Sequence, residues 1–353
     1  MVIVVSALPY YLVTSENNYL PRIDVQNLSQ NGFSIWVANA TKLSLITPTV
    51  IALGKFDGIH LGHQKVIQPI LEGQNREITD KIYSTVVTFD PHPQQFFSGQ
   101  PHHLLTPLEE KVEQLCSLGV KQLVLLPFDK ELCALTPTEF VEKILIHQLK
   151  AIKISVGEDF RFGSCRLGAA EDLQIIAAKY NIPVHIVPLA GDEDNSPISS
   201  TTIRQALNQG DIIKANQLLG RKYTLMGTVV EGEKLGTNIG FPTANLELPS
   251  DKFLPKKGVY AVRVSTTSST QGNVLKSDSR GIMNIGICPT VNGTQVSVEV
   301  HLLDWSGDLY GERLLVKIEK FLRSEQKFNS LKALTNQISC DCDTANSFFQ
   351  SRC

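Results

Sequence analysis

Two histidines, His60 and His63, stand three residues apart in the stretch "ALGKFDGIHLGH" (52–63), which begins inside an apolar run at residues 49–53. The pattern predicts a strand that turns into a helix. Glycines at such a turn let a ligand approach the backbone, and a helix N-terminus offers free N–H groups and a positive dipole end to an anion. Because residues three apart share one helix face, we expect both histidines to face the same bound phosphate.

Other interpretations of this stretch stay open from the residues alone. Its glycines match neither G-x-G-x-x-G nor G-x-x-x-x-G-K-[ST], so the two common phosphate loops are excluded. Two histidines near a helix start are often plain surface residues. A metal site would need at least a third ligand. The candidates for that ligand are three further histidines: His92, His102 and His103.

A second polar segment, "ISSTTIRQAL" (198–207), follows the last apolar run of the same half. Hydroxyls can donate to phosphate oxygens, and a guanidinium can hold a phosphate bidentately. Alone, such a run is more often a helix cap. In one domain with the histidine turn, it predicts a clamp for a triphosphate. The side chains of the clamp would be Ser199, Ser200, Thr201 and Arg204.

Strand-like apolar runs alternate with helical patterns from residue 49 to about 205. The candidate strands are "TVIAL", "KIYSTVVTF", "KQLVLLPF", "IKISVG" and "VHIVPL". Two intervening helices carry a start signal of Thr at the N-cap, Pro at the first helical position and Glu three residues after the Thr: 106–109 and 136–139. The alternation predicts a parallel, doubly wound sheet.

After about residue 220, strands follow one another with turn signals and no helix between them: "YTLMGTVVEG", "GVYAVRVS", "GIMNIG", "VSVEVHLLDW" and "LLVKIEKFL". This pattern predicts an antiparallel barrel or sandwich. We expect a hairpin loop at 265–280, a helix against the barrel from residue 329 onward, and a domain boundary near 208–222. The first 35 residues fit neither domain and are expected to be an extension.

The carboxyl half also carries residues that could do chemistry. In "GFPTANL", Thr243 and Asn245 lie two apart at a strand start, so their oxygens share one face and would suit Mg²⁺. In "VSVEVHLLDW", Glu299 alternates with valines and shares a face with Ser297 and His301. Without further context, the first motif is more often a turn and the second an exposed carboxylate.

The composition is that of a soluble protein with two domains. The chain has 353 residues, of which 42% are apolar and 19% charged, and a formal net charge of −2. No block of like charge points to nucleic acid or a membrane surface. The seven cysteines form no Cys-x-x-Cys pair, which indicates neither a disulfide framework nor a zinc site and fits a reducing compartment. Since no apolar stretch approaches the roughly 18 residues that would span a bilayer, we expect a cytoplasmic protein.

Eight segments resemble, in order, those of the bacterial bifunctional riboflavin kinase/FAD synthetase family. They are "FDGIHLGH", "TFDPHP", "VGEDFRFGSCRLG" and "SSTTIR" in the amino half, and "GFPTAN", "MNIGICPTVNG", "VEVHLLDWSGDLYG" and "FLRSEQKF" in the carboxyl half. The resemblance covers nearly everything after about Trp36. It implies a Rossmann-like nucleotidyltransferase domain (36–210), then an antiparallel β-barrel riboflavin kinase domain ending in a helix (215–350), with an N-terminal extension (1–35).

The resemblance also implies two reactions that use ATP and Mg²⁺. The barrel would phosphorylate riboflavin to FMN, and the α/β domain would transfer AMP from ATP to FMN, giving FAD and pyrophosphate. The alternative is an FMN adenylyltransferase with an inactive or flavin-binding barrel. A role like that of tRNA synthetases is disfavoured, because the chain has neither a Lys-Met-Ser-Lys-Ser type segment nor a basic patch. We therefore expect small-molecule partners only, and the sequence leaves the oligomeric state open.

Site residues carry over from the family by motif. The catalytic residues would be His60, His63 and Glu299, with Glu299 as the general base on the ribityl 5′-hydroxyl. ATP and its phosphates would contact Gly54, Phe56, Asp57, Gly58, Ser199, Ser200, Thr201, Arg204 and Lys234. The flavin would contact Pro91, His92, Pro93, Asp159, Phe160, Arg161 and Phe162. Mg²⁺ would be held by Thr243 and Asn245.

Two departures from the family pattern are visible. Lys55 stands where the family usually has Asn, and Gly236-Thr237 stands where it usually has Gly-Arg. Lys234 is the nearest cation to the second position, but Lys and Arg are not interchangeable at a bidentate site. The alternative with an inactive barrel rests on this difference.

Overall fold

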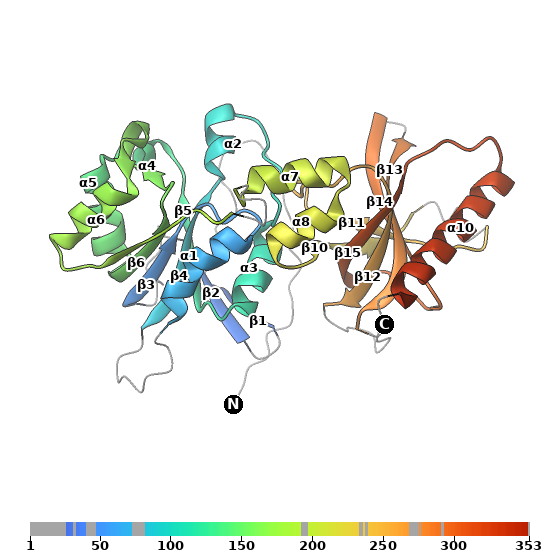
Figure 1. The fold of residues 1–353 in the computed structure, drawn as a ribbon, viewed down its shortest axis with the longest axis horizontal. Helices are drawn as coiled ribbons and strands as arrows, with labels where there is room; N and C mark the ends of the chain where they lie inside the picture. Colours follow the sequence, from blue (N-terminus) through green and yellow to red (C-terminus); the bar gives the residue numbers. More distant parts are fainter. Residues whose placement is uncertain are drawn as a thin grey trace.

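The computed structural model describes residues 26–30, 33–39, 47–72, 82–191, 197–232, 236, 239–267, 275, 277–290 and 293–351. Figure 1 shows an α/β half on the left and a β-barrel on the right, with helix α8 (Ile212–Leu219) between them. The predicted order of an α/β domain followed by an antiparallel barrel is confirmed. Within the described residues, no helix has the length and hydropathy that crossing a bilayer requires.

The α/β half is built on a seven-stranded sheet with the order β1-β2-β5-β4-β3-β6-β9. The strands from β2 to β9 pair in parallel, and β1 joins the edge antiparallel. Their bounds are β1 Gln26–Gln30, β2 Phe33–Asn39, β3 Thr49–Leu53, β4 Tyr83–Asp90, β5 Gln122–Pro127, β6 Ala151–Gly157 and β9 Val184–Val187. The five strands predicted from apolar runs are all present. A separate hairpin pairs β7 (Arg161–Phe162) with β8 (Gly168–Ala169).

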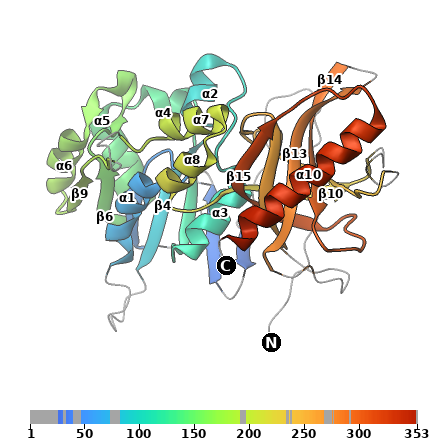
Figure 2. The same ribbon diagram turned by 45° about the vertical axis from the view of Figure 1, so that its right-hand side comes forward.

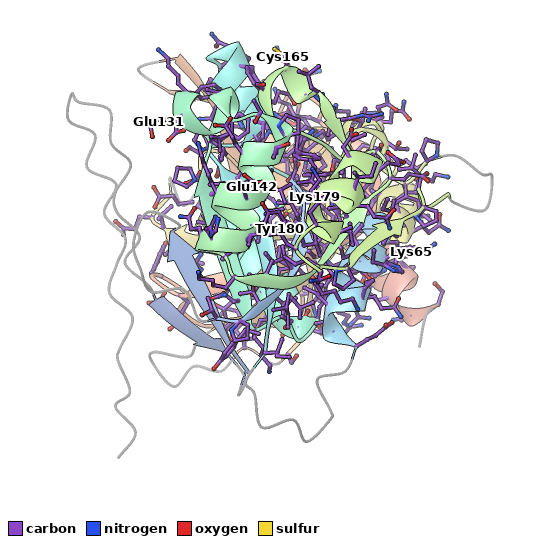
Figure 3. The ribbon with its side chains drawn as sticks, turned by 90° about the vertical axis from the view of Figure 1, so that its left-hand side faces the viewer. Lys65, Glu131, Glu142, Cys165, Lys179 and Tyr180 are labelled. Atoms are coloured by element: carbon purple, nitrogen blue, oxygen red, sulfur yellow. The ribbon has the colours of Figure 1, made fainter. Side chains whose placement is uncertain are left out.

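Helices cover both faces of this sheet, as the doubly wound prediction requires. The helices of this half are α1 Leu61–Leu71, α2 Pro93–Ser98, α3 Leu108–Ser117, α4 Lys130–Ala134, α5 Pro137–Glu139, the π-helix η1 Phe140–Gln148, the 3₁₀-helix η2 Ser164–Arg166, α6 Ala170–Ala178 and α7 Ser200–Gln209. Ala52 packs with α1 and α3, whereas Leu53 packs with η1 and α6. At the surface of the α/β half, the Tyr180 hydroxyl donates to the Glu142 carboxylate of η1 at 2.5 Å (Figure 3).

The two Thr-Pro start signals behave differently. Thr136 caps α5 as predicted, because its hydroxyl accepts from the Glu139 amide and the Glu139 carboxylate accepts from the Thr136 amide. In the first signal, Pro107 holds the N-cap position of α3 without a side-chain cap. The Thr106 hydroxyl instead accepts a hydrogen bond from the Gly58 amide at 2.9 Å. The prediction of a Thr106 cap is therefore wrong, since this hydroxyl supports the histidine turn.

The turn after β3 stands at the switch point of the sheet. From β3 the chain order runs outward through β4 and β5 on one side, and through β6 and β9 on the other. In open α/β sheets, ligands bind at such a point, beyond the carboxyl ends of the strands. The topology therefore places the turn that begins at Gly54 where a ligand is expected.

The second half is a closed six-stranded barrel with the order β10-β11-β14-β13-β12-β15, antiparallel throughout. Its strands are β10 Tyr223–Val230, β11 Ala244–Glu247, β12 Gly258–Thr266, β13 Ser279–Thr290, β14 Gly293–Leu302 and β15 Arg313–Ser324. Met283 points into the barrel, whereas its neighbour Ile282 packs outside against Phe349 of α10 (Leu331–Gln350). Helix α10 lies across the barrel in Figures 1 and 2, which confirms the predicted terminal helix.

Three segments between or beside the domains extend the sequence prediction. β1 lies among the first 35 residues, and its backbone pairing with β2 adds it to the sheet edge although "QNLSQ" has no apolar pattern. α8 lies within the expected boundary at 208–222 and buries Leu218 in one apolar cluster with Tyr223 of the barrel. The expected hairpin at 265–280 joins the antiparallel strands β12 and β13. Its residues 268–274 and 276 lie outside the described residues.

Candidate functional site

The turn after β3 has a strained backbone. Phe56, Gly58 and Ile59 have φ values of 47°, 94° and 42°. A positive φ is uncommon in residues other than glycine, costs on the order of 1–3 kcal/mol, and persists only where the surroundings enforce it. The surroundings here are apolar, because Phe56 and Ile59 are each 1% exposed and pack in the core with α1 and α3. Burial of these two side chains therefore fixes the backbone that carries Asp57 and His60.

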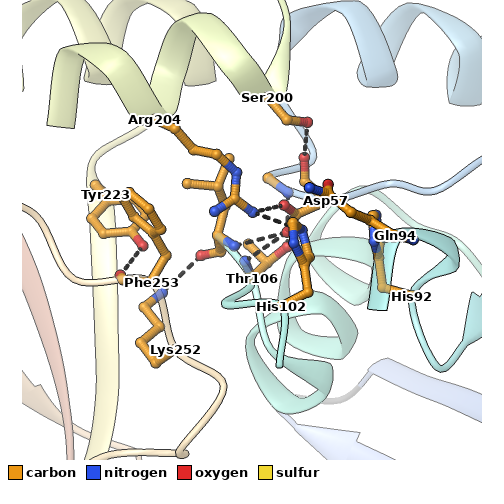
Figure 4. Close-up of polar contacts among 12 residues, drawn as sticks. Asp57, His92, Gln94, His102, Thr106, Ser200, Arg204, Tyr223, Lys252 and Phe253 are labelled. Atoms are coloured by element: carbon orange, nitrogen blue, oxygen red, sulfur yellow. Dashed lines mark hydrogen bonds and ion pairs between the residues drawn. The ribbon is translucent and has the colours of Figure 1, made fainter. Parts of the chain in front are cut away.

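Asp57 joins the two polar segments found in the sequence. Its carboxylate accepts hydrogen bonds from the amides of Leu105 and Thr106 at 2.8 and 3.3 Å. The same carboxylate pairs with Nη2 of Arg204 at 2.6 Å. Its backbone carbonyl accepts from the Ser200 hydroxyl at 2.8 Å. Figure 4 shows Arg204 and Ser200 reaching Asp57 from the same helix, so the structure brings the two segments together.

His60 and His63 form a neutral, stacked pair, with 3.7 Å between ring centroids. His60 is the N-cap of α1, and its Nδ1 accepts from the His63 amide at 3.3 Å, which leaves the ring proton on Nε2. Burial lowers the pKa of His60 from 6.5 to about 4; Asp57 opposes this shift and Arg221 adds to it. Burial, with His60 nearby, lowers the pKa of His63 well below 6.5. At pH 7, His60 therefore offers an N–H donor without a charge.

The N-termini of α1 and α7 face the same space. A Cβ atom added at Gly62 would lie 3.1 Å from Nδ1 of His60 and 3.5 Å from the carbonyl oxygen of Ile198, the residue before the α7 N-cap. The first turn of α1 therefore lies close to the start of α7. The free N–H groups and positive dipole ends of both helices favour an anion between them.

The hydroxyls of the second segment have separate roles. Ser199 is the N-cap of α7, and its hydroxyl accepts from the Thr202 amide at 3.1 Å, as in the capping interpretation. The Ser200 hydroxyl is bound to Asp57. The Thr201 side chain is exposed and has no hydrogen-bond partner within the part of the chain that the structure describes. Of the three predicted hydroxyls, Thr201 is thus the one left to a ligand.

Arg204 is held by residues from three other segments. Its Nη2 reaches Asp57 and lies 3.3 Å from Nε2 of His102. Its guanidinium lies over the Phe253 ring, 4.7 Å from the centroid. His102 in turn stacks on His92, with 4.2 Å between centroids. Since these contacts use Nη2, a phosphate would bind the remaining guanidinium N–H groups, Nε and Nη1.

The predicted flavin residues follow β4 and β6, at the same edge of the sheet. Pro91, His92 and Pro93 come after β4, and Nδ1 of His92 accepts from the Gln94 amide at 3.3 Å at the start of α2. Burial and, next, His102 lower the pKa of His92 to about 4. This ring is also neutral at pH 7, which suits contact with an uncharged ring system.

Residues after β6 divide between surface and core. Asp159 and Arg161 are exposed, and Phe160 is partly buried. Phe162 is 5% exposed and packs against Phe140, with 5.6 Å between ring centroids. Phe160 stacks on Phe162 at 5.7 Å. Phe162 therefore supports the Phe160 ring from the core, and Phe160 is the aromatic surface available to a ligand.

In the barrel, Glu299 stands between two amide side chains. The strand pairing sets it opposite Asn245 of β11 and opposite Asn284 of β13. Cβ atoms of directly opposed residues are about 4.5–5.5 Å apart on one face. This face is the outer one, because Val298 and Val300 point into the barrel core, as the alternation predicts. The three residues form a partly exposed polar row.

The oxygens of Thr243 and Asn245 fit a divalent cation that arrives with a nucleotide. A hydroxyl and an amide oxygen are hard donors, and Mg²⁺ takes its other ligands from water and phosphate. Glycines let these two side chains lie close against the backbone: a Cβ added at Gly232 would lie 2.1 Å from Nδ2 of Asn245, and one at Gly236 would lie 3.2 Å from Oγ1 of Thr243. Within the described residues, no group of three or more His, Cys, Asp or Glu side chains could hold a metal ion. Two residues of the expected nucleotide loop lie outside the described ranges: Lys234 and Thr237.

Comparison with known proteins decides the family. Residues 43–202 match the family described as FAD synthetase, and residues 219–349 match the family described as riboflavin kinase. The chain is 37% identical over 306 residues to a bifunctional riboflavin kinase/FMN adenylyltransferase of Listeria monocytogenes, covering 85% of this chain and 92% of that protein. It is 38% identical over 302 residues to the protein of the same name from Escherichia coli K12, with the same coverage. The chain belongs to the bifunctional riboflavin kinase/FMN adenylyltransferase family.

Membership in the riboflavin kinase/FMN adenylyltransferase family confirms the resemblance inferred from the motifs. An FAD synthetase domain and a riboflavin kinase domain are both present, in the predicted order. Among solved structures, the chain resembles a crystal structure described as a macrolide-efflux protein from Streptococcus pneumoniae, with a TM-score of 0.74 and 31% identity. The match covers 88% of this chain and 98% of that one, so the two share the whole two-domain fold.

Motif spacing missed Lys111, a buried lysine of the FAD synthetase domain. Lys111 on α3 is 7% exposed, and burial lowers its pKa while the carboxylates of Asp57 and Asp90 oppose the shift. It stands three residues after Leu108 and four before Leu115, on the apolar face of the helix. A lysine in that stripe is the signal that could have identified it.

Two further contacts join residues that are far apart in the sequence. Nη2 of Arg221 donates to the Gly58 carbonyl at 2.8 Å across 163 residues, so it holds the histidine turn from the start of the barrel half. In the riboflavin kinase domain, Nδ1 of His301 lies 2.8 Å from the Pro242 carbonyl oxygen, just before Thr243. A carbonyl can only accept, so His301 donates this bond and holds the backbone just before Thr243, one of the candidate magnesium ligands.

Proposed function

We propose that the α/β half transfers AMP from ATP to FMN at the turn after β3, and that the barrel half makes this FMN at Glu299. One observation carries the first assignment. Two helix N-termini, two neutral histidines and Arg204 converge on one rigid turn at the switch point of the sheet. All of these groups favour an anion, and His60 presents an N–H donor because its Nδ1 already accepts from the His63 amide, which suits transfer between two phosphates.

In adenylyl transfer, an oxygen of the FMN phosphate attacks the α-phosphorus of ATP, and the bond to the bridging oxygen breaks to release pyrophosphate. The attacking oxygen carries no proton, so positioning and charge stabilisation are the main requirements. The Nε2–H of His60, with His63 stacked beside it, would donate to the α-phosphate. Arg204 and the α7 amides, with Thr201, would hold the departing pyrophosphate. The backbone that cradles the phosphates would be Gly54, Phe56, Asp57 and Gly58.

On the flavin side, Phe160 would pack against the ring system, with Phe162 acting through Phe160. His92 would face the flavin from the end of β4, between Pro91 and Pro93. The exposed side chains Asp159 and Arg161 would reach the polar edge of the flavin. Support comes from the position of both segments at the carboxyl ends of strands β4 and β6, beside the switch-point strand β3.

In the barrel, Glu299 would accept the proton of the ribityl 5′-hydroxyl as its oxygen attacks the γ-phosphorus of ATP. Thr243 and Asn245 would hold Mg²⁺, which when bound neutralises charge on the nucleotide phosphates. Asn245 also faces Glu299 across the strand pair, so the cation and the base would lie side by side. Lys234 is proposed as a further phosphate contact from the loop before these residues.

We also propose domain limits of 36–210 and 215–350 and a cytoplasmic enzyme that acts on small molecules. The proposed extension at 1–35 includes β1, which pairs with β2 at the edge of the α/β sheet. The two family matches, at 43–202 and 219–349, support this division. The cysteine pattern of the sequence supports the location.

A product assay tests the proposal. The purified chain would be given ATP and Mg²⁺ with either riboflavin or FMN, and FMN and FAD would be followed by chromatography. We expect FAD from both substrates, with FMN as an intermediate from riboflavin. FAD from FMN alone would indicate an inactive barrel and point to Gly236-Thr237. If neither riboflavin nor FMN gives FAD, the proposal is overturned.

A further inference from the structure

A loop of the barrel half is joined to the segment that holds Asp57. The Leu104 amide donates to the Asp251 carbonyl at 2.5 Å, and the Phe253 amide donates to the Leu104 carbonyl at 2.8 Å. Leu104 and Lys252 thus form a short parallel bridge across the two halves. The next residues along the chain from Leu104, Leu105 and Thr106, supply the amides that bind the Asp57 carboxylate.

Lys252 is the centre of this junction. Its side chain is 1% exposed, and its ammonium donates to the Leu105 carbonyl at 2.8 Å and to the Glu110 carboxylate at 2.6 Å. It also lies over the Tyr223 ring, 4.4 Å from the centroid. The backbone of Leu105 is therefore held on both sides of its Cα atom: Lys252 binds its carbonyl and Asp57 binds its amide.

The neighbouring residue Phe253 contacts the site directly. Its ring lies under the Arg204 guanidinium, and its carbonyl accepts from the Tyr223 hydroxyl at 2.6 Å. Figure 4 shows Lys252, Phe253 and Tyr223 on one side of this cluster and Asp57 on the other, with Arg204 between them. The barrel half thus supplies one group that orients the guanidinium, the Phe253 ring, and holds Leu105, whose amide binds another, Asp57.

Simple attachment of two domains does not explain a buried ion pair. Removing a lysine and a glutamate from water is costly, and apolar side chains of similar volume often stabilise an interface equally well or better. Burial indeed lowers the pKa of Lys252 and raises that of Glu110, each opposed by its partner. What a charged, directional pair adds is a fixed geometry for the groups bonded to it.

We propose that the barrel half completes the adenylyl transfer site, with Lys252 as a positioning residue that fixes Leu105 and, through it, Asp57 and Arg204. This inference rests on the proposed adenylyl transfer at the turn after β3. It assigns to the riboflavin kinase half a second role, independent of its own chemistry.

The test uses the full chain and its two measurable reactions. Lys252→Met removes the ammonium, and Lys257→Met is the matched control, since Lys257 is exposed on the same connection. A double variant, Lys252→Met with Glu110→Leu, replaces the buried pair by apolar side chains and avoids an unpaired buried carboxylate. FMN formation from riboflavin reports folding, and FAD formation from supplied FMN reports the adenylyl transfer site.

We expect kcat for FAD formation to fall roughly 10- to 100-fold in both Lys252 variants, because small misplacements of positioned groups have effects of this size. KM for FMN, FMN formation from riboflavin, and the Lys257→Met variant should stay near wild type. If Lys252→Met does not fold, FAD formation by the double variant provides the test instead. Near-normal FAD formation in the folded double variant would overturn the inference, because the pair would then be structural only. A wild-type chain that makes no FAD from FMN would remove the proposed function, and this inference with it.

Discussion

The two candidate sites differ in what holds their functional groups. The groups that meet at Asp57 are distant in sequence, since Leu105 is 48 residues away and Arg204 is 147 residues away. In the barrel, Glu299 and its neighbours Asn245 and Asn284 stand side by side because their strands pair in register. The first site is a cluster that long-range hydrogen bonds must assemble, and the second is a row on the surface of a sheet.

This difference determines how far the effect of a substitution spreads. In the cluster, Asp57 binds three other residues through its carboxylate, so a change at one position displaces several groups. In the row, each side chain is carried by its own strand, so a change at one position removes one function. Both reactions can be followed on one sample of protein, so each serves as the folding control for the other.

The largest effect is expected in the row. Glu299→Gln keeps the size of the side chain and removes the proposed base, so FMN formation from riboflavin should fall roughly 10²- to 10⁴-fold. FAD formation from supplied FMN should be unchanged. Ser297→Ala, two residues earlier on the same face of β14, is the control and should retain FMN formation. Near-normal turnover of riboflavin by Glu299→Gln would show that another group is the base.

A similar loss is expected in the cluster from His60→Asn. Asparagine is a good N-cap, so the start of α1 should be retained, but the Nε2–H group proposed to donate to the phosphate is lost. Removing one such donor lowers kcat by about 10²- to 10³-fold in comparable sites. We expect FAD formation to fall by this amount with FMN formation intact. His185→Asn, at an exposed position on β9, is the control. Equal rates in the two variants would exclude His60 from the reaction.

The buried histidines also make stability depend on pH. The pKa of His60 is about 4 in the folded chain and 6.5 ordinarily, so the unfolded chain binds more protons between these values. The stability that depends on neutral His60 should therefore be fully present above pH 6.5 and should fall as the pH drops toward 4. From pH 7 to 4.5, the His60 contribution to this loss is about 2–3 kcal/mol. Urea denaturation at both pH values should show a loss smaller by this amount in His60→Asn. An unchanged loss in that variant would show that His60 is not responsible.

The parts of the fold and site that could be predicted from the sequence depend on local periodicity. Strand β14 could be predicted in detail, because alternation alone places Val298 and Val300 inside and Glu299 outside. The N-cap role of Thr136 could also be predicted, since its partner Glu139 is three residues away. The turn after β3 was identified by its glycines and histidines, which are local features too.

What the sequence could not show depends on partners far along the chain. Lys252 stands in a loop with Asp251, Pro255 and two further lysines, a composition typical of an exposed turn. Its burial follows from contact with Glu110, 142 residues away. The hydroxyl of Ser200 was expected to bind phosphate, but it bonds Asp57 across 143 residues. Such assignments need the fold, because no spacing rule connects the two positions.

The smallest effect is expected from removing the threonine hydroxyl in each of the two Thr-Pro motifs, and it should differ between them. Thr106 and Thr136 both precede Pro, and Val is close to Thr in shape, so Thr106→Val and Thr136→Val remove one hydroxyl each. The first leaves the buried Gly58 amide without its acceptor, at a cost of about 1–3 kcal/mol. The second removes an exposed N-cap, at a cost of about 1 kcal/mol. Both should lower the free energy of unfolding in urea, but only Thr106→Val should also slow FAD formation, because its hydroxyl holds the strained turn. If both variants make FAD at the wild-type rate, the turn does not depend on Thr106 and the cluster is less tightly coupled than its hydrogen bonds imply.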